Sequence, residues 1–211
     1  AGEVASKMAV SQIIDFFDSN ISNYRCNVND YVSLVKDAFL YVNENVYLKS
    51  IKNKEYIGMG TTLIVVLIID RNMIVGHVGD SRVYFIRDHS IKKITTDHSY
   101  VAELIKNGTI KPEEAHNHPQ KNLITRAIGT GSTIEVDINI FDLKKGDYIV
   151  MCTDGLSNML EETEIMNAVL LDKGLNERCN DLIKLANDKG GHDNITVIII
   201  EVDEGGPNHD R

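Results

Sequence analysis

The sequence predicts an α+β fold in which antiparallel sheets pack together and helices lie outside them. Three observations predict this class. Apolar residues recur at helical intervals up to about residue 46, nearly continuous or alternating apolar runs follow in 58–95 and 133–153, and helical spacing returns in 163–188 before a last apolar run at 195–200. Helices, a block of strands, more helices and a closing strand are the order expected for sheets covered by helices.

Two helices are expected before the first strand. Apolar residues occupy helical positions in 3–17, and the pattern resumes at Asp30 with Leu34, Val35 and Ala38. Asn29 or Asp30 would cap the second helix, because either side chain can accept a hydrogen bond from a free backbone amide at the helix start.

The middle of the chain predicts an antiparallel meander. Residues 58–70 are nearly continuous in Leu, Ile and Val, which is typical of a strand covered on both faces. After it we expect a hairpin turn at Arg71-Asn72 and a strand at 73–78, which a break at Gly79-Asp80 ends. Extended structure at 81–87, a turn at 88–90 and a strand at 91–95 would follow.

A polar region interrupts the strands. A short helix from Tyr100 to Asn107 would end at Gly108, and we interpret about 98–122 as a mobile flap because its second half is polar and holds two prolines. The remaining expected elements are strands at 133–142 and 148–153, helices at 163–171 and 175–188, a closing strand, and a frayed tail at 203–211.

Composition bounds the function. A chain of 211 residues with 43% hydrophobic residues fits one domain, which we place at 1–202. The apolar runs at 63–69 and 195–200 are too short to cross a bilayer, so no membrane partner is expected. A net charge of -9 argues against a nucleic-acid partner. Three cysteines without a pairing pattern indicate a reducing, cytoplasmic location.

Two carboxylates stand where an apolar strand meets a turn. Asp154 follows the run 147–152, and Asp193 precedes the run 195–200. If these two strands pair side by side, both carboxylates reach one rim of the sheet and could share a divalent cation. The alternative for Asp154 is a helix cap or turn residue, which Asp often provides.

Five ordered segments carry a family resemblance. They are Gly76-His77-Val78-Gly79-Asp80-Ser81-Arg82, Thr95-Thr96-Asp97-His98-Ser99, Leu123-Ile124-Thr125-Arg126-Ala127-Ile128-Gly129, Thr153-Asp154-Gly155-Leu156-Ser157 and Gly190-Gly191-His192-Asp193-Asn194. In this order the chain resembles the bacterial type 2C metal-dependent serine/threonine protein phosphatases from residue 1 to about residue 202. The resemblance implies a four-layer α-β-β-α sandwich.

The resemblance also implies a metal site. Asp154 and Asp193 would be ligands of an inner pair of Mn²⁺ or Mg²⁺ ions, and the nucleophile would be a metal-bound water with no catalytic protein nucleophile. Asp97 would bind a third, weaker ion, although helix capping is its alternative. Asp80 and Asn194 would support the metal ligands or metal-bound water without binding a metal themselves. For Asp80, the alternative is a purely structural carboxylate beside a bulge.

The resemblance further implies substrates and partners. The substrates would be phosphoserine and phosphothreonine in proteins, produced by a bacterial serine/threonine kinase, and we expect a monomer. His118 and Arg126 match the family near the flap and would face the substrate, but a salt bridge at a strand edge is the alternative for Arg126. His116 and His118 stand two residues apart in a polar loop without cysteines, which does not predict zinc.

One departure from the family opens an alternative. The family begins with an Asn-Glu-Asp motif and an Asp-Gly-Met-Gly-Gly segment, and this chain opens with residues that resemble those just after them. In the family these segments supply the Asp that bridges both metals and the Arg that holds phosphate, so we expect the N-terminal strands to be absent from the chain. The alternative function is a catalytically inactive type 2C-like module that binds a phosphoprotein or another partner.

Overall fold

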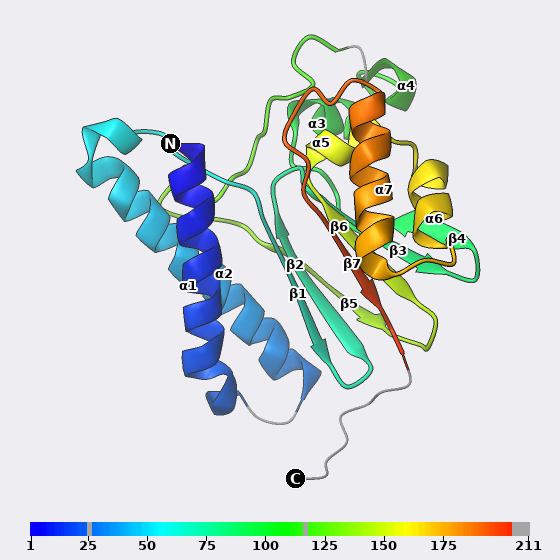
Figure 1. Ribbon diagram of the computed structural model, residues 1–211. Helices are drawn as coiled ribbons and strands as arrows, with labels where there is room; N and C mark the ends of the chain where they lie inside the picture. The colour runs from blue at the N-terminus through cyan, green and yellow to red at the C-terminus, as the bar shows by residue number, and fades with distance from the viewer. Residues whose placement is uncertain (25–26, 116–117, 204–211) are drawn as a thin grey trace. The chain divides into compact units, whose positions relative to one another are not determined.

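The computed structural model describes residues 1–24, 27–115 and 118–203. The chain divides into two compact units, each built from two separate stretches: unit 1 comprises 1–80 and 97–141, and unit 2 comprises 81–96 and 142–211. Each unit combines one sheet with helices, and the strands pair in antiparallel fashion (Figure 1). The predicted α+β class is therefore confirmed, whereas a single domain over 1–202 stays a prediction.

Unit 1 begins with the two expected helices, α1 (Gly2–Asn20) and α2 (Val28–Lys52), which are followed by the short 3₁₀ helices η1 (Ile21–Asn23) and η2 (Lys54–Tyr56), respectively. The predicted cap at Asn29 or Asp30 is wrong. Asn27 caps α2, and its side chain accepts the Asp30 amide at 3.1 Å. The cap must have extended backbone, which Asn27 has at φ -140°, while Asn29 and Asp30 lie inside the first helical turn.

The sheet of unit 1 has the strand order β1-β2-β5, with β1 at Leu63–Ile69, β2 at Asn72–Val78 and β5 at Asp137–Asp142. Ile69 faces Asn72 across the hairpin, so the turn is Asp70-Arg71 and not Arg71-Asn72. Asp70 adopts φ 52°, a left-handed conformation that Asp tolerates better than most residues. The strand also starts later than predicted, at Leu63, and Gly58 lies outside extended geometry with φ 74°.

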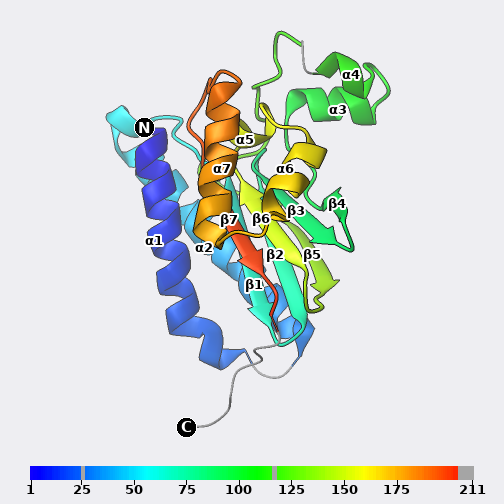
Figure 2. The ribbon, with the colours of Figure 1, turned by 45° about the vertical axis from the view of Figure 1, so that its right-hand side comes forward.

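Helix α2 packs closely on β2. A side chain at Gly76 would begin 2.7 Å from atoms of Phe39 and of Val35, so the absent side chain lets the helix approach the strand. Figures 1 and 2 both show α1 beside α2, which agrees with the contacts between the two helices. The buried core of unit 1 consists of Ala5, Ala9, Val35, Phe39, Val42, Val46, Met59, Leu63, Ile74, Val78 and Ile128.

The flap region contains more helix than expected. Helix α3 (Tyr100–Lys106) confirms the predicted helix, and Ser99 caps it by accepting the Ala102 amide at 3.3 Å. Gly108 follows with φ 70°. A second short helix, α4 (Pro112–Ala115), was not predicted, because four residues are too few to show a period. Of the His116/His118 pair, His116 lies outside the described residues.

The predicted single meander is wrong at Gly79-Asp80-Ser81. Strand β2 belongs to the sheet of unit 1, whereas β3 (Arg82–Arg87) and β4 (Ser90–Lys93) belong to the sheet of unit 2. Gly79 has φ 117°, so the chain turns away from extended geometry there and changes sheets. The β3–β4 hairpin turns at Asp88-His89, where both residues have positive φ, as a type I′ turn requires.

Unit 2 has a four-stranded sheet in the order β4-β3-β6-β7, with β6 at Tyr148–Cys152 and β7 at Val197–Glu201. Its helices are α5 (Asp154–Ser157), α6 (Glu162–Val169) and α7 (Leu175–Asp188), and the bounds of α7 match the prediction. Figures 1 and 2 show α6 and α7 beside this sheet, and the two helices enclose a core with residues of the strands, including Tyr84, Val150, Leu156, Ile165 and Leu182.

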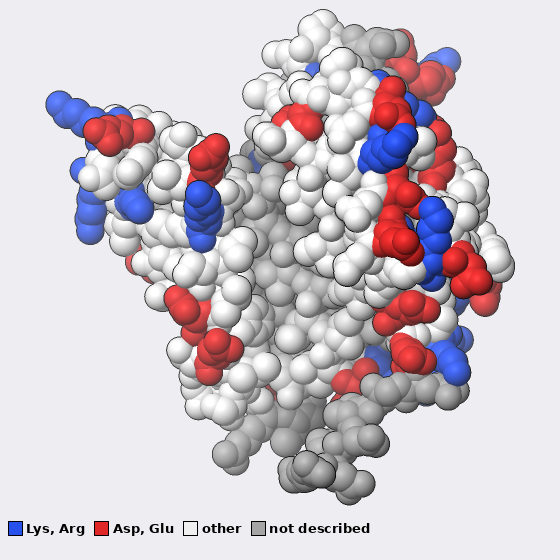
Figure 3. Space-filling model, viewed as in Figure 1, with Lys and Arg blue, Asp and Glu red and all other residues white. Residues whose placement is uncertain are grey.

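The outer surface of α6 and α7 is charged. Figure 3 shows acidic side chains interspersed with basic ones on this part of the visible face. The pairs include Glu164 with Lys189, Asp181 with Lys173 and Asp188 with Lys184. None of the helices in the described part of the chain is long and apolar enough to cross a membrane.

Candidate metal centre and its surroundings

The two strands that flank Asp154 and Asp193 pair side by side, which is the condition under which both carboxylates were expected at one rim. Strand β6 pairs with β7 in antiparallel fashion, and Cys152 at the end of β6 faces Val197 at the start of β7. In an antiparallel pair, the residues that follow one strand and those that precede its partner leave the sheet at the same end. Asp154 and Asp193 therefore lie at one rim of the sheet of unit 2.

Thr153 ties the two loops together. Its amide donates to the Thr196 carbonyl at 3.1 Å, and the Thr196 amide donates to Thr153 Oγ1 at 3.0 Å. The same hydroxyl donates to the Asn194 carbonyl at 3.2 Å. One residue thus fixes the segment that carries Asp193 against the residue before Asp154.

Gly155 permits a closer approach of these loops than any other residue would. A Cβ atom at this position would lie 2.3 Å from the Asn194 carbonyl oxygen and 3.0 Å from its carbonyl carbon. Those atoms are backbone and cannot rotate away as a flexible side chain would. The glycine between a strand and a turn, which by itself is ordinary turn chemistry, here sets the spacing of two acidic loops.

The Asp154 carboxylate is half-buried and lies in the field of Asp193. Burial and the negative charge of Asp193 raise the pKa of Asp154, and the Gly155 amide, Arg82 and the Asn158 side chain offset this only in part. The Asn158 amide donates to Asp154 Oδ2 at 3.2 Å. Asp193 is exposed, and its Oδ1 accepts the amide of Asn194 at 2.7 Å.

These residues fit a divalent cation. Two carboxylates that repel each other in a partly buried site become favourable when a hard cation binds between or beside them. No group of three or more His, Cys, Asp or Glu side chains suited to a metal occurs in 1–24, 27–115 and 118–203. If Asp154 and Asp193 bind a cation, they would supply only part of its coordination shell, which would suit Mg²⁺ and Mn²⁺ because these ions bind oxygen and often keep waters.

Asn194, which was predicted to support the metal ligands, is exposed, and it acts on the site through its backbone. Its carbonyl accepts from Thr153, and its amide donates to Asp193. These contacts belong to the segment that places Asp193. A supporting role for its side chain stays a prediction.

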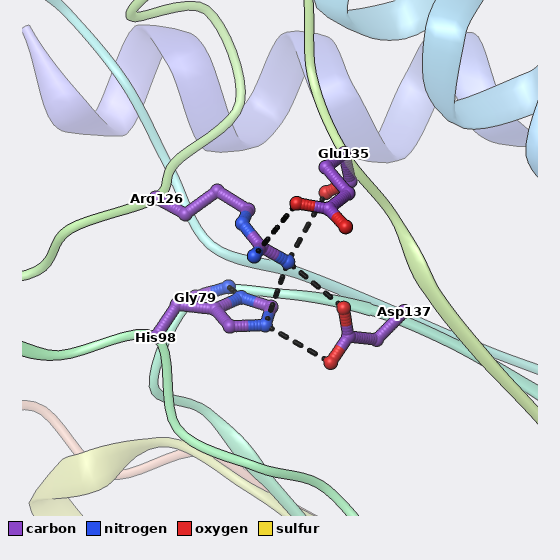
Figure 4. A network of polar contacts seen from close by, with 5 residues as sticks. All are labelled: Gly79, His98, Arg126, Glu135 and Asp137. Carbon is purple, nitrogen blue, oxygen red and sulfur yellow. Dashed lines mark hydrogen bonds and ion pairs between the residues drawn. The ribbon is translucent and has the colours of Figure 1, made fainter. Parts of the chain in front are cut away.

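In unit 1, Asp80 and Asp97 flank one polar network, which Figure 4 shows. Both aspartates are half-buried. Each directly follows or precedes a network residue: Asp80 follows Gly79, and Asp97 precedes His98. Helix capping, the alternative role for Asp97, is provided by Ser99, whose hydroxyl accepts the Ala102 amide at the start of α3.

Arg126 forms the salt bridge that was weighed as the alternative to substrate contact. Its guanidinium donates to Asp137 Oδ1 at 2.8 Å and to Glu135 Oε2 at 3.1 Å (Figure 4). Burial raises the pKa of Asp137, but the hydrogen bonds from His98 and Arg126 outweigh it and hold that pKa below its ordinary value. A substrate contact by Arg126 stays a prediction.

His118 is half-buried within the flap region. Its ring lies 6.0 Å from the Tyr100 ring, and its Nδ1 accepts the Gln120 amide at 3.1 Å. These contacts tie His118 to the residues around α3. A role toward the substrate stays a prediction.

Sequence reasoning missed several residues that shape these sites: Gly79, His98, Asp137, Thr153 and Gly155. His98 and Gly79 lie inside the ordered motifs, next to the aspartates that carry the family pattern. Thr153 and Gly155 likewise flank Asp154. The available signal was therefore the residue beside each acid, whereas Asp137 has no local signal because its partners are distant in sequence.

Comparison with known proteins identifies the family. The sequence profile described as Protein phosphatase 2C matches residues 1–195. The protein phosphatase PhpP of Streptococcus pneumoniae is 40% identical over 209 residues, which are 97% of this chain and 81% of PhpP.

Solved structures agree. A bacterial serine phosphatase superposes with a TM-score of 0.91 at 32% identity, and the match covers 98% of this chain and 83% of the phosphatase chain. The catalytic domain of the serine/threonine phosphatase PstP, in complex with two manganese ions, has a TM-score of 0.83 at 30% identity and covers 96% and 82%. The chain belongs to the protein phosphatase 2C family and is a serine/threonine protein phosphatase.

Proposed function

We propose that this phosphatase removes phosphate from phosphoserine and phosphothreonine in proteins with two divalent cations, for which Asp154 and Asp193 are ligands. The observation that carries the assignment is the packing of Gly155 against Asn194, which forces two acidic loops together at the rim of β6 and β7. A structural cap would not need the second carboxylate. Their mutual repulsion is a standing electrostatic cost that a bound cation removes.

The residues of the chain prepare the site for an anionic substrate. When bound, the cations would acidify the attacking water and offset the charge of the phosphoryl oxygens. Asp154 and Asp193 orient their carboxylates through Asn158 and through the Asn194 amide. Because the chain carries a net charge of -9, a phosphoprotein needs this local reversal of charge to approach the site.

The oxygen donors favour Mn²⁺ or Mg²⁺ over softer metals. PstP, a relative, was crystallised with two manganese ions. We extend the proposal to a third, weaker ion at Asp97 in unit 1. A site with few protein ligands leaves the cation largely hydrated and holds it loosely, so this ion would bind at higher metal concentration.

The proposed partners follow from the reaction. A phosphatase of serine and threonine requires a kinase that phosphorylates the same residues, so the substrates are proposed to be the products of a bacterial serine/threonine kinase. Cys152 and Cys179 are free thiols, which supports a cytoplasmic location. We further propose that the enzyme acts as a monomer without nucleic-acid or membrane partners.

The first test measures Mn²⁺-dependent hydrolysis of a phosphothreonine peptide by the intact protein, whose mass is confirmed beforehand. Asp193→Asn is expected to lower kcat by at least about 100-fold while the unfolding midpoint is retained, since a neutral amide is a poor ligand for a hard cation. Asp188→Asn is the matched control, because Asp188 is exposed at the end of α7 and pairs with Lys184. Turnover near the wild-type level in Asp193→Asn at saturating Mn²⁺ would rule the assignment out.

Calorimetric titration with Mn²⁺ separates the enzyme from the inactive alternative. The proposed function requires Mn²⁺ uptake that Asp154→Asn or Asp193→Asn weakens. A folded protein that binds a phosphoprotein but neither takes up Mn²⁺ nor hydrolyses the peptide would instead be a binding module.

A further inference from the structure

His98 is held at four points. Its amide donates to the Gly79 carbonyl at 2.8 Å, and its carbonyl accepts the Thr125 amide at 2.9 Å. In the ring, Nδ1 accepts the Gly79 amide at 3.0 Å, and Nε2 lies 3.2 Å from Asp137 Oδ2. The side chain is only 7% exposed. A solvated histidine would need none of these contacts, so they fix both the backbone and the ring.

The contacts determine the tautomer. Because the Gly79 amide donates to Nδ1, that nitrogen carries a lone pair, and the proton of a neutral ring must be on Nε2. The Nε2 proton then points to the Asp137 carboxylate (Figure 4). Arg126 Nη1 donates to Asp137 Oδ1 at 2.8 Å, so ring and guanidinium both donate to one carboxylate. In this tautomer the 2.9 Å contact between Arg126 Nη1 and Nε2 joins two N–H groups and is not a hydrogen bond.

Gly79 completes a reciprocal clamp. It gives its amide to the His98 ring and its carbonyl to the His98 amide, so two hydrogen bonds join the segment of Asp80 to that of Asp97. Gly79 has φ 117°, and a Cβ there would lie 2.3 Å from the Thr62 side chain, which excludes other residues. His77 supports the arrangement, because its buried ring stacks on His98 with centroids 4.8 Å apart.

We propose that His98 is a positioning residue for a weakly bound divalent cation at Asp97: the Gly79–His98 clamp fixes the backbone beside Asp97 and Asp80, and Asp137 holds the ring in the tautomer that the clamp requires. This inference rests on the proposed binding of a cation by Asp97. In this arrangement His98 and Asp137 would act on the cation site without binding the cation themselves. Loss of groups that orient metal ligands commonly lowers metal affinity tenfold or more, and here the orientation would act through the backbone beside Asp97.

Two substitutions of His98 separate its two ring contacts. In His98→Asn, the Oδ1 atom can replace Nδ1 as acceptor for the Gly79 amide, although the side chain is too short for Asp137. In His98→Gln, the amide nitrogen can reach toward Asp137, but no acceptor remains beside Cβ for Gly79. The clamp therefore predicts that His98→Asn keeps the Mn²⁺ affinity of the weak site, whereas His98→Gln and His98→Leu, which lack the acceptor for Gly79, lose it.

The experiment measures Mn²⁺ binding by the free-ion electron paramagnetic resonance signal. We expect a weaker site that Asp97→Ala removes, whose Kd rises about tenfold in His98→Leu and His98→Gln but about twofold or less in His98→Asn. The tighter binding that depends on Asp154 stays unchanged in all three. His89→Asn is the matched control, because His89 is exposed in the β3–β4 turn and Asn tolerates its positive φ of 57°.

A second readout does not depend on metal or activity. Nitrogen-15 NMR of the histidine rings should show His98 as the Nε2–H tautomer in the wild type, and Asp137→Leu should shift it toward a mixture. Circular dichroism checks that each variant is folded. If His98→Leu does not fold, the comparison of His98→Asn with His98→Gln decides.

The outcomes distinguish the inference from the function beneath it. If Asp97→Ala leaves every Mn²⁺ site intact, the proposed cation at Asp97 is wrong. If Asp97→Ala removes the weak site but Gln and Asn at position 98 bind Mn²⁺ equally well, or His98 carries its proton on Nδ1, the positioning inference alone is overturned.

Discussion

At residue 155, the absence of a side chain decides how two acidic loops meet. Replacing Gly155 with Ala would place a methyl group 2.3 Å from the Asn194 carbonyl oxygen, so the segment of Asp193 must move. We expect Gly155→Ala to raise the Kd for Mn²⁺ about tenfold, as loss of ligand orientation commonly does, and to lower the free energy of unfolding by about 1–3 kcal/mol through overpacking.

Mn²⁺ titration and urea unfolding check this prediction. Gly174→Ala is the control, because Gly174 has φ -63° and the nearest atom to a Cβ there is Glu177 Oε2 at 3.8 Å. Equal Mn²⁺ affinity in Gly155→Ala and the wild type would show that the close approach of the loops does not set the spacing of the carboxylates.

Asp147 predicts a pH dependence of stability. Its side chain is 1% exposed, accepts Arg87 Nη2 at 2.6 Å and also accepts the Lys144 amide. Burial raises its pKa, but these partners outweigh burial and leave the pKa below the ordinary value. The folded state therefore favours the ionised form, and this stabilisation is present above the unfolded pKa of about 3.9 and is lost as pH falls through the folded value.

Asp147→Asn should therefore destabilise the protein by about 3 kcal/mol at neutral pH, because it leaves the Arg87 charge without its partner. The difference from the wild type should shrink as pH falls below about 4. Urea unfolding at both pH values measures it, with Asp142→Asn as comparison, since exposed Asp142 bonds Arg87 through its carbonyl and its carboxylate acts on Arg87 only through its charge. A difference that does not change with pH would exclude ionisation as the cause.

At the scale of elements, one side chain fastens helix α2 to the turn that precedes β5. Asn43 is 2% exposed, accepts the Gly129 amide at 2.8 Å and donates to the Gly131 carbonyl at 3.0 Å. Asn43→Ala would leave a buried donor and acceptor without partners, and each such loss costs about 1–3 kcal/mol.

We expect Asn43→Ala to lower the free energy of unfolding by about 2–4 kcal/mol. Asn45→Ala should have less than half that effect, because the Asn45 side chain bonds the Tyr41 carbonyl within the same helix. Denaturant unfolding of both variants makes the comparison. Similar losses in the two would mean that the bridge from α2 does not contribute more than a local helix contact.

Elements with a clear local period were predictable, and those that depend on distant residues were not. The amphipathic helix 175–188 has its expected bounds because three turns of apolar spacing identify it. The change of sheet at Gly79 was missed, since β2 and β3 have similar local patterns and only long-range pairing separates them. The pairing of β6 with β7 was considered only as the condition for a shared rim of Asp154 and Asp193, and it too becomes visible only in the folded chain.

The candidate site shows the same limit. Asp154 and Asp193 could be singled out from strand ends and the family motifs. Their spacing depends on the contact of Gly155 with Asn194, and the network of His98 depends on Asp137, which lies 39 residues later in the sequence by the printed numbering. Local sequence patterns identify the aspartates, but only the folded chain shows the contacts that position them.

At the scale of the whole molecule, composition predicted an acidic globular chain but not its division. Each compact unit is assembled from two stretches that are separated in sequence. No local composition change marks residues 80/81, 96/97 or 141/142, because the boundaries arise from which strands pair. The chain carries a net charge of -9. A cation that binds the acidic loops only in the folded state must stabilise that state.

Mn²⁺ at about 100 times its Kd should stabilise the folded protein by about 2.7 kcal/mol, which for a chain of this size corresponds to a rise in Tm of roughly 5–10 °C. Asp154→Asn should lose most of this rise. Without metal, the same variant should be at least as stable as the wild type, because the substitution removes the repulsion between Asp154 and Asp193 that raises the pKa of Asp154.

Thermal unfolding in chelator and in excess Mn²⁺ gives the Tm of the wild type and of Asp154→Asn with and without metal. Asp188→Asn is the control, because it removes an exposed carboxylate that pairs with Lys184. The combination of a stable metal-free variant and a lost Mn²⁺ response separates a ligand from a structural acid. A structural Asp154 would instead reduce Tm equally with and without metal. That second pattern would mean that the acidic rim of unit 2 serves the fold, and the metal would have to be held elsewhere.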